Sequence, residues 1–417
     1  MTPKPIHTVD ELATYVRKID EADDPLDRHN AFGAFSFDKD FSDLHRLDPF
    51  SKPYRDAALR HYEEVACKAY DVASESDVLA YDPLDPVPFC SRSPASVGQQ
   101  LGAISTIVRD FPVSPPGRVL DVGTGWGHTA EMLARTGFHV DGFDINRSYL
   151  DIVDATAKRQ GLTDRLQTIC AEFDQIGQLP HCYDAILFYE AFHHSLDHSK
   201  LIDDCLSRLN SSGYFIFAGE PIHADWHIPW GIRTDSLSAY CIHKFGWMEL
   251  GFDEEYFLKL LHSKGLAVYS RKYVDHPIAN NFIATRRGNT VPLSRVALPS
   301  YCESSWNMAE ASPIRWTKGK GMIPGWMVEG QSVAFEVANH SGATMPVGLF
   351  AENQCIEVKP VASGETLRIG GAIPKGTHHV SIYSPNWRPS VVSGSLDDRL
   401  LGVAVSNLIY TDASTPA

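Results

Sequence analysis

Three glycines and a carboxylate stand in a spacing that suits a nucleoside-binding turn. The stretch Val119–His128 holds Gly123, Gly125 and Gly127 at every second position, directly after a short apolar run. Glycine lets the backbone turn tightly and lets a ligand approach the main chain. Asp144 follows Gly123 by 21 positions, at the end of the next apolar run. A carboxylate there can accept hydrogen bonds from both hydroxyls of a ribose.

The charge of this turn distinguishes two classes of ligand. A dinucleotide site places a pyrophosphate at the turn and has its third glycine where this chain has His128. Asp121, just before the glycines, would repel a pyrophosphate and attract a cation. S-Adenosylmethionine carries an ammonium and a sulfonium group and has no phosphate. We therefore expect this cofactor at the turn.

A histidine pair follows the fourth apolar run of the same region, within the segment 188–198. In parallel sheets, ligands lie outside the carboxyl ends of the strands, so this segment faces the reacting methyl group. Methyl transfer to an oxygen needs an aligned acceptor and a base of near-neutral pKa. We expect His193 or His194 to be the catalytic base, with Asp197 orienting it. The alternative is that the pair only shapes the pocket.

Metal binding is a third interpretation of this region. The possible ligands are Glu190, His193, His198, Glu220 and His223. Their spacing matches no known coordination geometry, so the sequence predicts no metal site.

A segment dense in tryptophan, glycine and paired charges, residues 229–252, follows the fifth apolar run. Aromatic faces stack on sugar rings, and arginine or aspartate binds ring hydroxyls in defined directions. The expected acceptor contacts are Trp230, Arg233, Asp235 and Trp247. The alternative is a lid whose aromatic residues only pack together. The chain lacks the Asn/Asp–Pro–Pro–Tyr and Pro–Cys patterns of base-methylating enzymes, which favours a small-molecule or glycan acceptor.

Alternating apolar and helix-period segments predict an α/β fold with a mostly parallel sheet. Strands are expected at 118–122, 138–143, 166–170, 183–188, 214–218, 266–273 and 281–285, and helices at 126–136, 147–160, 201–209 and 252–264. Residues 1–112 are expected to be helical, with helices at 9–19 and 54–72. The segment 288–300 is a linker candidate. Short strand-like runs in 301–417 predict a β-sandwich.

Composition limits the class of protein. The chain has 417 residues and a formal net charge of −15, which disfavours a nucleic-acid partner. The first residues lack the apolar core of a signal peptide, and no apolar run is long enough to span a bilayer. We expect a cytoplasmic protein with reduced thiols. The eight cysteines contain no C-x-x-C pair: Cys67, Cys90, Cys170, Cys182, Cys205, Cys241, Cys302 and Cys355.

From Gly117 to Arg286 the pattern resembles the class I S-adenosylmethionine-dependent methyltransferase superfamily. The resemblance implies a Rossmann-like domain, here 113–287, with a seven-stranded, mostly parallel sheet. It places Asp121 near the methionine moiety of the cofactor and Asp144 at its ribose, and Ile145 is a further expected cofactor contact. The three glycines would form the turn, and Glu172 or Phe173 would flank the adenine.

Two further segments resemble proteins of bacterial surface-polysaccharide biosynthesis. The segment 229–252 is similar to the lid of methyltransferase-like proteins of that process. The motif 387–406, with Ile314–Trp316, is similar to β-sandwich modules that accompany glycosyltransferases and methyltransferases, although the family often has Phe where this chain has Trp387. The expected function is O-methylation of a sugar in surface polysaccharide or its precursor, with glycan-assembly proteins as possible partners. The alternatives are a secondary-metabolite or lipid methyltransferase and a non-catalytic scaffold.

Overall fold

The computed structural model describes residues 3–22, 31–76, 94–273, 277–294, 296–307 and 314–411. The chain folds into two compact units. Unit 1 comprises residues 1–256 and 271–283, and unit 2 comprises residues 257–270 and 284–417. Cys90 lies outside the described residues, and each described cysteine is a free thiol. Within the described ranges, no helix combines the length and the apolar character that a membrane crossing requires.

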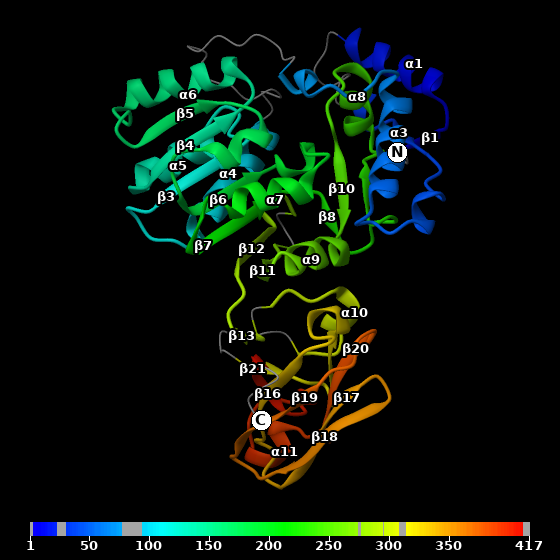
Figure 1. Cartoon of the computed structure of the whole chain (residues 1–417), viewed down its shortest axis with the longest axis vertical. Helices are drawn as coiled ribbons and strands as arrows, with labels where there is room; N and C mark the ends of the chain where they lie inside the picture. Colours follow the sequence, from blue (N-terminus) through cyan, green and yellow to red (C-terminus); the bar gives the residue numbers. More distant parts are fainter. Residues whose placement is uncertain are drawn as a thin grey trace. The chain divides into compact units, whose positions relative to one another are not determined.

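A seven-stranded sheet carries the motifs described above (Figure 1). Its strand order is β11-β12-β7-β6-β3-β4-β5. The strands are β3 (Arg118–Val122), β4 (His139–Asp144), β5 (Leu166–Cys170), β6 (Tyr183–Tyr189), β7 (Leu209–Ala218), β11 (Leu266–Arg271) and β12 (Asn281–Arg286). β3 pairs in parallel with both β4 and β6, so the strand order reverses at β3. The sequence prediction of an α/β domain with parallel strands is confirmed.

The helices that follow these strands begin and end at residues that commonly cap helices. α6 begins after Asn146, whose side chain accepts a hydrogen bond from the Ser148 N–H, and ends at Gly161 in the left-handed conformation. α5 ends in the same way at Gly137. The helices around the sheet in Figure 1 are α4 (Pro94–Arg109), α5 (His128–Thr136), α6 (Arg147–Gln160), α7 (His198–Leu206) and α9 (Glu254–Ser263). Apolar side chains from α5 and α6 pack on β3 and β4 in one buried cluster.

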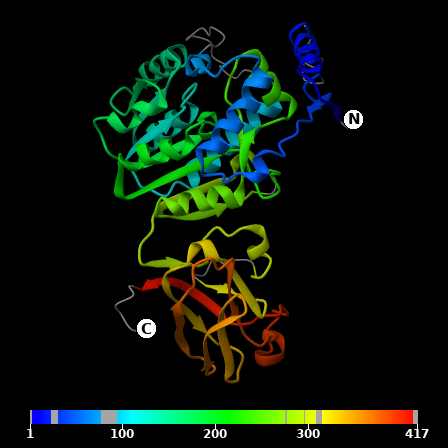
Figure 2. The ribbon, with the colours of Figure 1, turned by 45° about the vertical axis from the view of Figure 1, so that its right-hand side comes forward.

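The segment after β7 forms a small sheet of its own. Its order is β8-β10-β9, from β8 (Ile222–His223), β9 (Trp230–Ile232) and β10 (Leu250–Asp253), with α8 (Ser236–Lys244) between β9 and β10. Helix α3 (Lys52–Ala66) packs against β9 and α8, and Figure 2 shows this blue helix beside the green segment. Through this contact, the N-terminal region lies against the segment 229–252, which is expected from the sequence to bind the acceptor.

The described part of the N-terminal region contains helices and two short strands, and its helix boundaries differ from the expected ones. Its regular elements are β1 (Lys4–Ile6), α1 (Val9–Asp20), β2 (Phe35–Phe37) and α3. The helix expected over 54–72 ends at Ala66, because Cys67 adopts a left-handed conformation with φ of 54°. A 3₁₀ turn, Val72–Ser76, follows it. The expected and observed ends differ because the apolar period continues beyond the residue that breaks the helix.

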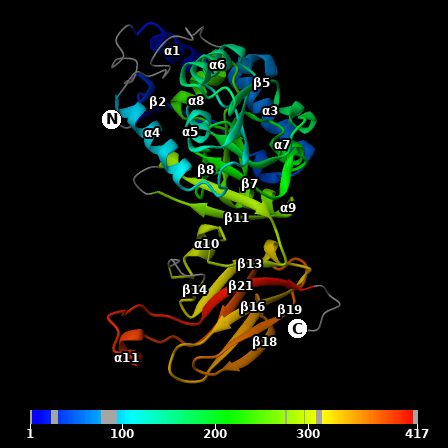
Figure 3. The same ribbon diagram turned by 90° about the vertical axis from the view of Figure 1, so that its left-hand side faces the viewer.

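Unit 2 contains two antiparallel sheets that share one cluster of buried apolar residues. The first has the order β13-β21-β16-β19, with β14 also paired to β21, and the second has the order β15-β20-β17-β18; Figure 3 shows β16 between β21 and β19. The strands are β13 (Thr290–Pro292), β14 (Arg315–Trp316), β15 (Lys320–Pro324), β16 (Ser332–Ala338), β17 (Met345–Ala351), β18 (Gln354–Val361), β19 (Thr366–Ala372), β20 (His379–Tyr383) and β21 (Ala404–Thr411), and the helices are α10 (Ser300–Glu303) and α11 (Pro389–Ser393). The segment 288–300, a linker candidate in the sequence, carries β13.

Candidate active site

A cavity of about 240 Å³ opens in unit 1 at the carboxyl ends of β3, β4, β5 and β6. Ligands of open parallel sheets bind at this edge, where the strand order reverses. The lining residues are Tyr70, Val72, Glu75, Gly123, Gly125, Asp144, Ile145, Tyr149, Glu172, Phe173, Glu190, Ala191, His194 and Trp247. Six of the eight expected cofactor-binding residues are among them.

The glycine turn lies between β3 and α5, and two of its glycines meet the cavity. Gly123 has φ of +70°, and a Cβ atom there would lie 2.4 Å from the Cβ of Ala191. No larger residue fits this close approach between the turn and the segment after β6. Gly125 has φ of +52°, and a Cβ atom there would meet nothing within 4 Å. The main chain at Gly125 is therefore open to a ligand, as the sequence pattern predicts.

Asp144 ends β4 and holds the turn in place. Its Oδ2 accepts a hydrogen bond from the Gly125 N–H at 2.9 Å, and its Oδ1 accepts one from the Asn146 N–H at 2.8 Å. Burial raises the pKa of the Asp144 carboxyl above its usual value. An ionised carboxylate has about four acceptor sites, so two remain for a ligand in the cavity.

Asp121 and Gly127 lie beside the cavity and do not line it. Asp121 is almost fully buried, and its Oδ2 accepts a hydrogen bond from the Thr124 hydroxyl at 2.8 Å. Burial, followed by the charge of Asp144, raises the pKa of Asp121 to about 7. Gly127 has φ of +77° at the start of α5 and faces Val153 of α6. The two acidic residues of the motif thus lie at the same edge of the sheet.

The far side of the cavity is formed by residues that follow β4 and β5. Ile145, Glu172 and Phe173, which the sequence offered as cofactor contacts, all line it. Tyr149 of α6 also lines the cavity and was not singled out from the sequence. Ile145, Tyr149 and Phe173 offer apolar and aromatic surface suited to a flat base such as adenine.

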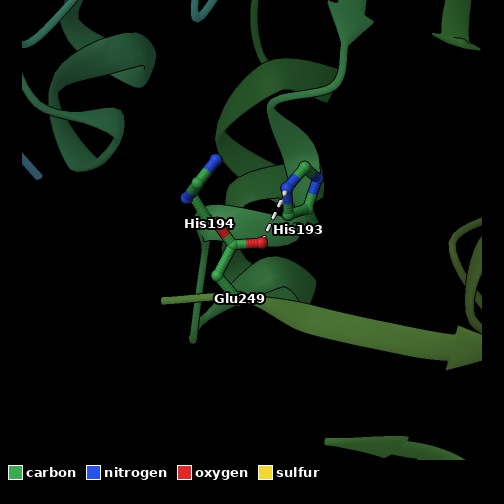
Figure 4. A group of neighbouring side chains, drawn as sticks. All are labelled: His193, His194 and Glu249. Atoms are coloured by element: carbon green, nitrogen blue, oxygen red, sulfur yellow. Dashed lines mark ion pairs between the residues drawn. The ribbon is translucent and has the colours of Figure 1, made fainter. Parts of the chain in front are cut away.

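The two histidines after β6 have different environments (Figure 4). His194 lines the cavity, and its Nδ1 lies 3.4 Å from Oε2 of Glu75. His193 is buried and does not line the cavity. Its Nδ1 lies 2.8 Å from Oε2 of Glu220, and its Nε2 lies 3.6 Å from Oε2 of Glu249. Of the pair, only His194 lines the cavity.

Carboxylates determine the charge at this end of the cavity. Burial, followed by the charge of Glu220, raises the pKa of Glu190 to about 7. Burial lowers the pKa of His194, but Glu75, Glu249 and Glu220 outweigh it and raise that pKa to about 9. Glu190 directly follows β6 with φ of 52°, an uncommon conformation for a residue with a side chain. Glu75 and Glu249 were not singled out from the sequence.

The expected acceptor contacts separate into one residue at the cavity and three away from it. Trp247 lines the cavity. Trp230 is buried, and its indole N–H donates to the Pro49 carbonyl at 2.9 Å. Asp235 caps helix α8, and its Oδ2 accepts a hydrogen bond from Nε of Arg233 at 3.0 Å. The packing interpretation therefore applies to Trp230, whereas Trp247 meets the cavity.

Two other possible metal ligands of the sequence pattern, His198 and Glu220, contact other partners. Nε2 of His198 lies 2.8 Å from the Tyr256 hydroxyl, and burial lowers the pKa of His198 to about 4. Glu220 accepts hydrogen bonds from the backbone N–H groups of Ala191 and Phe192 at 2.8 and 2.9 Å. The group whose ligand atoms do lie close together is His193, His194 and Glu249, all within 4.8 Å of one another.

The cavity suits a cationic nucleoside. Among the residues placed around it, none is Lys or Arg, whereas Glu75, Asp144, Glu172 and Glu190 all line it. A pyrophosphate would be repelled by this lining, and a sulfonium or ammonium group would be attracted. The open main chain at Gly125 and the free acceptor sites of Asp144 complete the fit to S-adenosylmethionine.

Part of the chain is similar to known methyltransferases. Residues 119–213 match a family described as a methyltransferase domain. A sarcosine/dimethylglycine N-methyltransferase of Aphanothece halophytica is 27% identical over 162 residues, covering 36% of this chain and 57% of that protein. A ubiquinone biosynthesis O-methyltransferase of Actinobacillus pleuropneumoniae is 34% identical over 104 residues, covering 24% and 44%. The chain thus spans about half the length of these curated relatives.

Solved structures with a similar fold include an O-methyltransferase of neocarzinostatin biosynthesis in complex with S-adenosyl-L-homocysteine and 1,4-dihydroxy-2-naphthoic acid. It has a TM-score of 0.35 and 18% identity, and the alignment covers 46% of this chain and 58% of that one. The match of residues 119–213 to a methyltransferase domain includes the glycine turn and Asp144.

Proposed function

We propose that this chain transfers the methyl group of S-adenosylmethionine to a hydroxyl oxygen of a sugar. The sugar belongs to a surface polysaccharide or to its nucleotide-linked or lipid-linked precursor. One observation carries the proposal: a single cavity joins the glycine turn and Asp144 to a polar end that includes Glu75, Glu190 and His194. A donor and a hydroxylated acceptor can therefore meet in one enclosed space.

The donor side follows from the contacts of Asp144. Its remaining acceptor sites bind the ribose hydroxyls, while Ile145, Glu172 and Phe173 flank the adenine. The buried carboxylate of Asp121 stabilises positive charge at the methionine end. When bound, S-adenosylmethionine supplies a methyl group on a sulfonium centre, and S-adenosylhomocysteine is the product.

The acceptor side must align a hydroxyl group and receive its proton. His194 and Glu190 both line the cavity, whereas His193 is held behind it by Glu220. The reacting oxygen loses its proton to Glu190 or to the neutral imidazole of His194 as it forms the bond to the methyl carbon. Because the pKa of His194 is about 9, its neutral form is the minor one at neutral pH. Trp247 offers an aromatic face against which a sugar ring can pack.

Three ionisable side chains, Glu75, Glu190 and His194, support a sugar acceptor, although most of the cavity lining is apolar. A lipid or an apolar secondary metabolite would leave these three side chains without polar partners on the acceptor. A scaffold without activity would not need the turn and Asp144 in a binding geometry. We include in the proposal that unit 2 is a β-sandwich module of glycan assembly, that glycan-assembly proteins are partners, and that the protein acts in the cytoplasm.

Turnover with defined acceptors tests this function. The full chain is incubated with S-adenosylmethionine and a set of nucleotide sugars, with aromatic phenols and fatty acids as competing classes, and S-adenosylhomocysteine is measured. Release with a nucleotide sugar, slowed about 10²–10⁴-fold in His194→Asn or Glu190→Gln, is the expected result. Release only with a phenol or fatty acid would refute the sugar acceptor.

A further inference from the structure

We propose that His193, His194 and Glu249 bind one divalent transition-metal ion at the acceptor end of the cavity. Figure 4 shows the two imidazoles on either side of the Glu249 carboxylate. His193 and His194 follow β6, and Glu249 directly precedes β10, so two distant parts of unit 1 supply the ligands. The sequence spacing alone could not indicate this group.

The distances suit ligands of one ion. One ligand atom from each of the three residues lies within 4.8 Å of the other two. Nε2 of His193 is 3.6 Å from Oε2 of Glu249, which is too long for a normal hydrogen bond. Two ligands about 2.1 Å from a tetrahedral metal ion are separated by about 3.4 Å. The observed separation is close to that of two atoms that share a cation.

The orientation of His193 is set in the way that metal-binding histidines are usually set. Its Nδ1 contacts Oε2 of Glu220 at 2.8 Å, which leaves Nε2 facing Glu249. Metal-ligating histidines commonly pair their second ring nitrogen with a carboxylate, which fixes the tautomer and the ring. Glu220 is itself fixed by the backbone N–H groups of Ala191 and Phe192.

The surroundings of the two imidazoles are rich in carboxylates, whose negative charge a cation would neutralise. Four glutamates interact with the imidazole pair or with one another: Glu75, Glu190, Glu220 and Glu249. Arg233 is the basic side chain paired with Glu249 in the structure, at 3.6 Å, and it also pairs with Asp235. Buried carboxylates need compensation by paired charges or by a metal ion. Protonated histidines are the alternative source of positive charge for these carboxylates, and the test below distinguishes the two.

Two imidazoles and one carboxylate identify the class of ion. This donor set suits Zn²⁺ and its first-row neighbours, whereas Mg²⁺ and Ca²⁺ prefer oxygen ligands alone. Three protein ligands also leave a coordination position free, as in catalytic zinc sites. Because His194 lines the cavity, that position faces the acceptor end.

The role of the ion rests on the proposed function, whereas its binding does not. A hydroxyl that occupies the free position has a lowered pKa. Its proton passes to Glu190, which lines the same cavity, and its oxygen forms the bond to the methyl carbon while the carbon–sulfur bond breaks. His194 then acts as a ligand, and the proton acceptor is the carboxylate.

Calorimetry of the full chain with Zn²⁺ tests the site. The protein is first treated with EDTA and dialysed, and ZnCl₂ is then added alone. One saturable site is expected in the wild type, and Glu249→Gln should weaken it more than about 100-fold. The matched control is His227→Asn, because His7, His45 and His227 line a separate surface pocket where zinc could bind nonspecifically. S-Adenosylmethionine binding and circular dichroism show that each variant is folded.

The outcomes separate the metal site from the function. A zinc site that is retained in the control and lost in Glu249→Gln supports the proposal. No zinc binding, equal binding in Glu249→Gln, or loss in the control would overturn it, and protonated histidines would then balance the carboxylates. A zinc site without any sugar methylation would refute the proposed function and leave the metal site standing.

Discussion

Replacing Asp144 by asparagine removes one charge from the donor site and keeps the shape of the side chain. The carboxylate accepts hydrogen bonds from the N–H groups of Gly125 and Asn146 at 2.9 and 2.8 Å, so the turn depends on it. Its two remaining acceptor sites are those assigned to the ribose hydroxyls. Hydrogen bonds to a charged group contribute about 1.5–3 kcal/mol each, and asparagine retains one oxygen acceptor.

We therefore expect Asp144→Asn to lose about 2 kcal/mol of binding free energy, which is about a 30-fold increase in Kd. Isothermal titration calorimetry with S-adenosylhomocysteine measures this Kd. Asp141→Asn is the matched control, because Asp141 lies on the same strand and is buried but pairs with Arg118 and Tyr183 away from the cavity. The control should lose stability and keep its Kd. A Kd for Asp144→Asn within about threefold of wild type would refute the assignment.

Three other comparisons test neighbouring features. Gly123→Ala should destabilise the fold by about 1–3 kcal/mol more than Gly125→Ala in urea unfolding, because its methyl group would meet a Cβ atom at 2.4 Å; equal losses would contradict the close approach. Asp121 has a folded pKa of about 7, above its unfolded value, so its contribution to stability is lost as pH rises between about 4 and 7. The free energy of unfolding of Asp121→Asn relative to the wild type should therefore increase as pH rises from about 4 to 7. A difference between the two proteins that stays constant with pH would contradict this prediction. Trp230→Phe should lose about 1 kcal/mol of stability without changing the KM for the acceptor. Trp247→Phe should raise that KM. A raised KM in Trp230→Phe would mean that Trp230 contacts the acceptor.

The donor half of the site could be predicted because its chemistry is local in the sequence. The turn from Gly123 to Gly127 and the acid Asp144 each follow directly after a strand, and parallel strands bring their carboxyl ends to one edge. The sign of the charge then distinguished a cationic ligand from a pyrophosphate. Residue type and spacing contain all of this information.

The acceptor half could not be predicted in the same way, because distant segments form it. Glu75 comes from a 3₁₀ turn of the N-terminal region, and Glu249 directly precedes β10, the central strand of a small sheet. Neither lies in a motif. Trp230 and Trp247 have the same residue type in one glycine-rich segment, and only packing shows that the first is buried while the second meets the cavity.

Ligand charge gives the most direct test of the central claim. The full chain is titrated by calorimetry with S-adenosylmethionine, with NAD⁺ and with ATP under identical conditions. An acidic cavity without Lys or Arg among its placed lining residues predicts one-to-one binding of S-adenosylmethionine and no binding of the two phosphate-bearing nucleotides. Binding of NAD⁺ or ATP, with none of S-adenosylmethionine, would contradict the account.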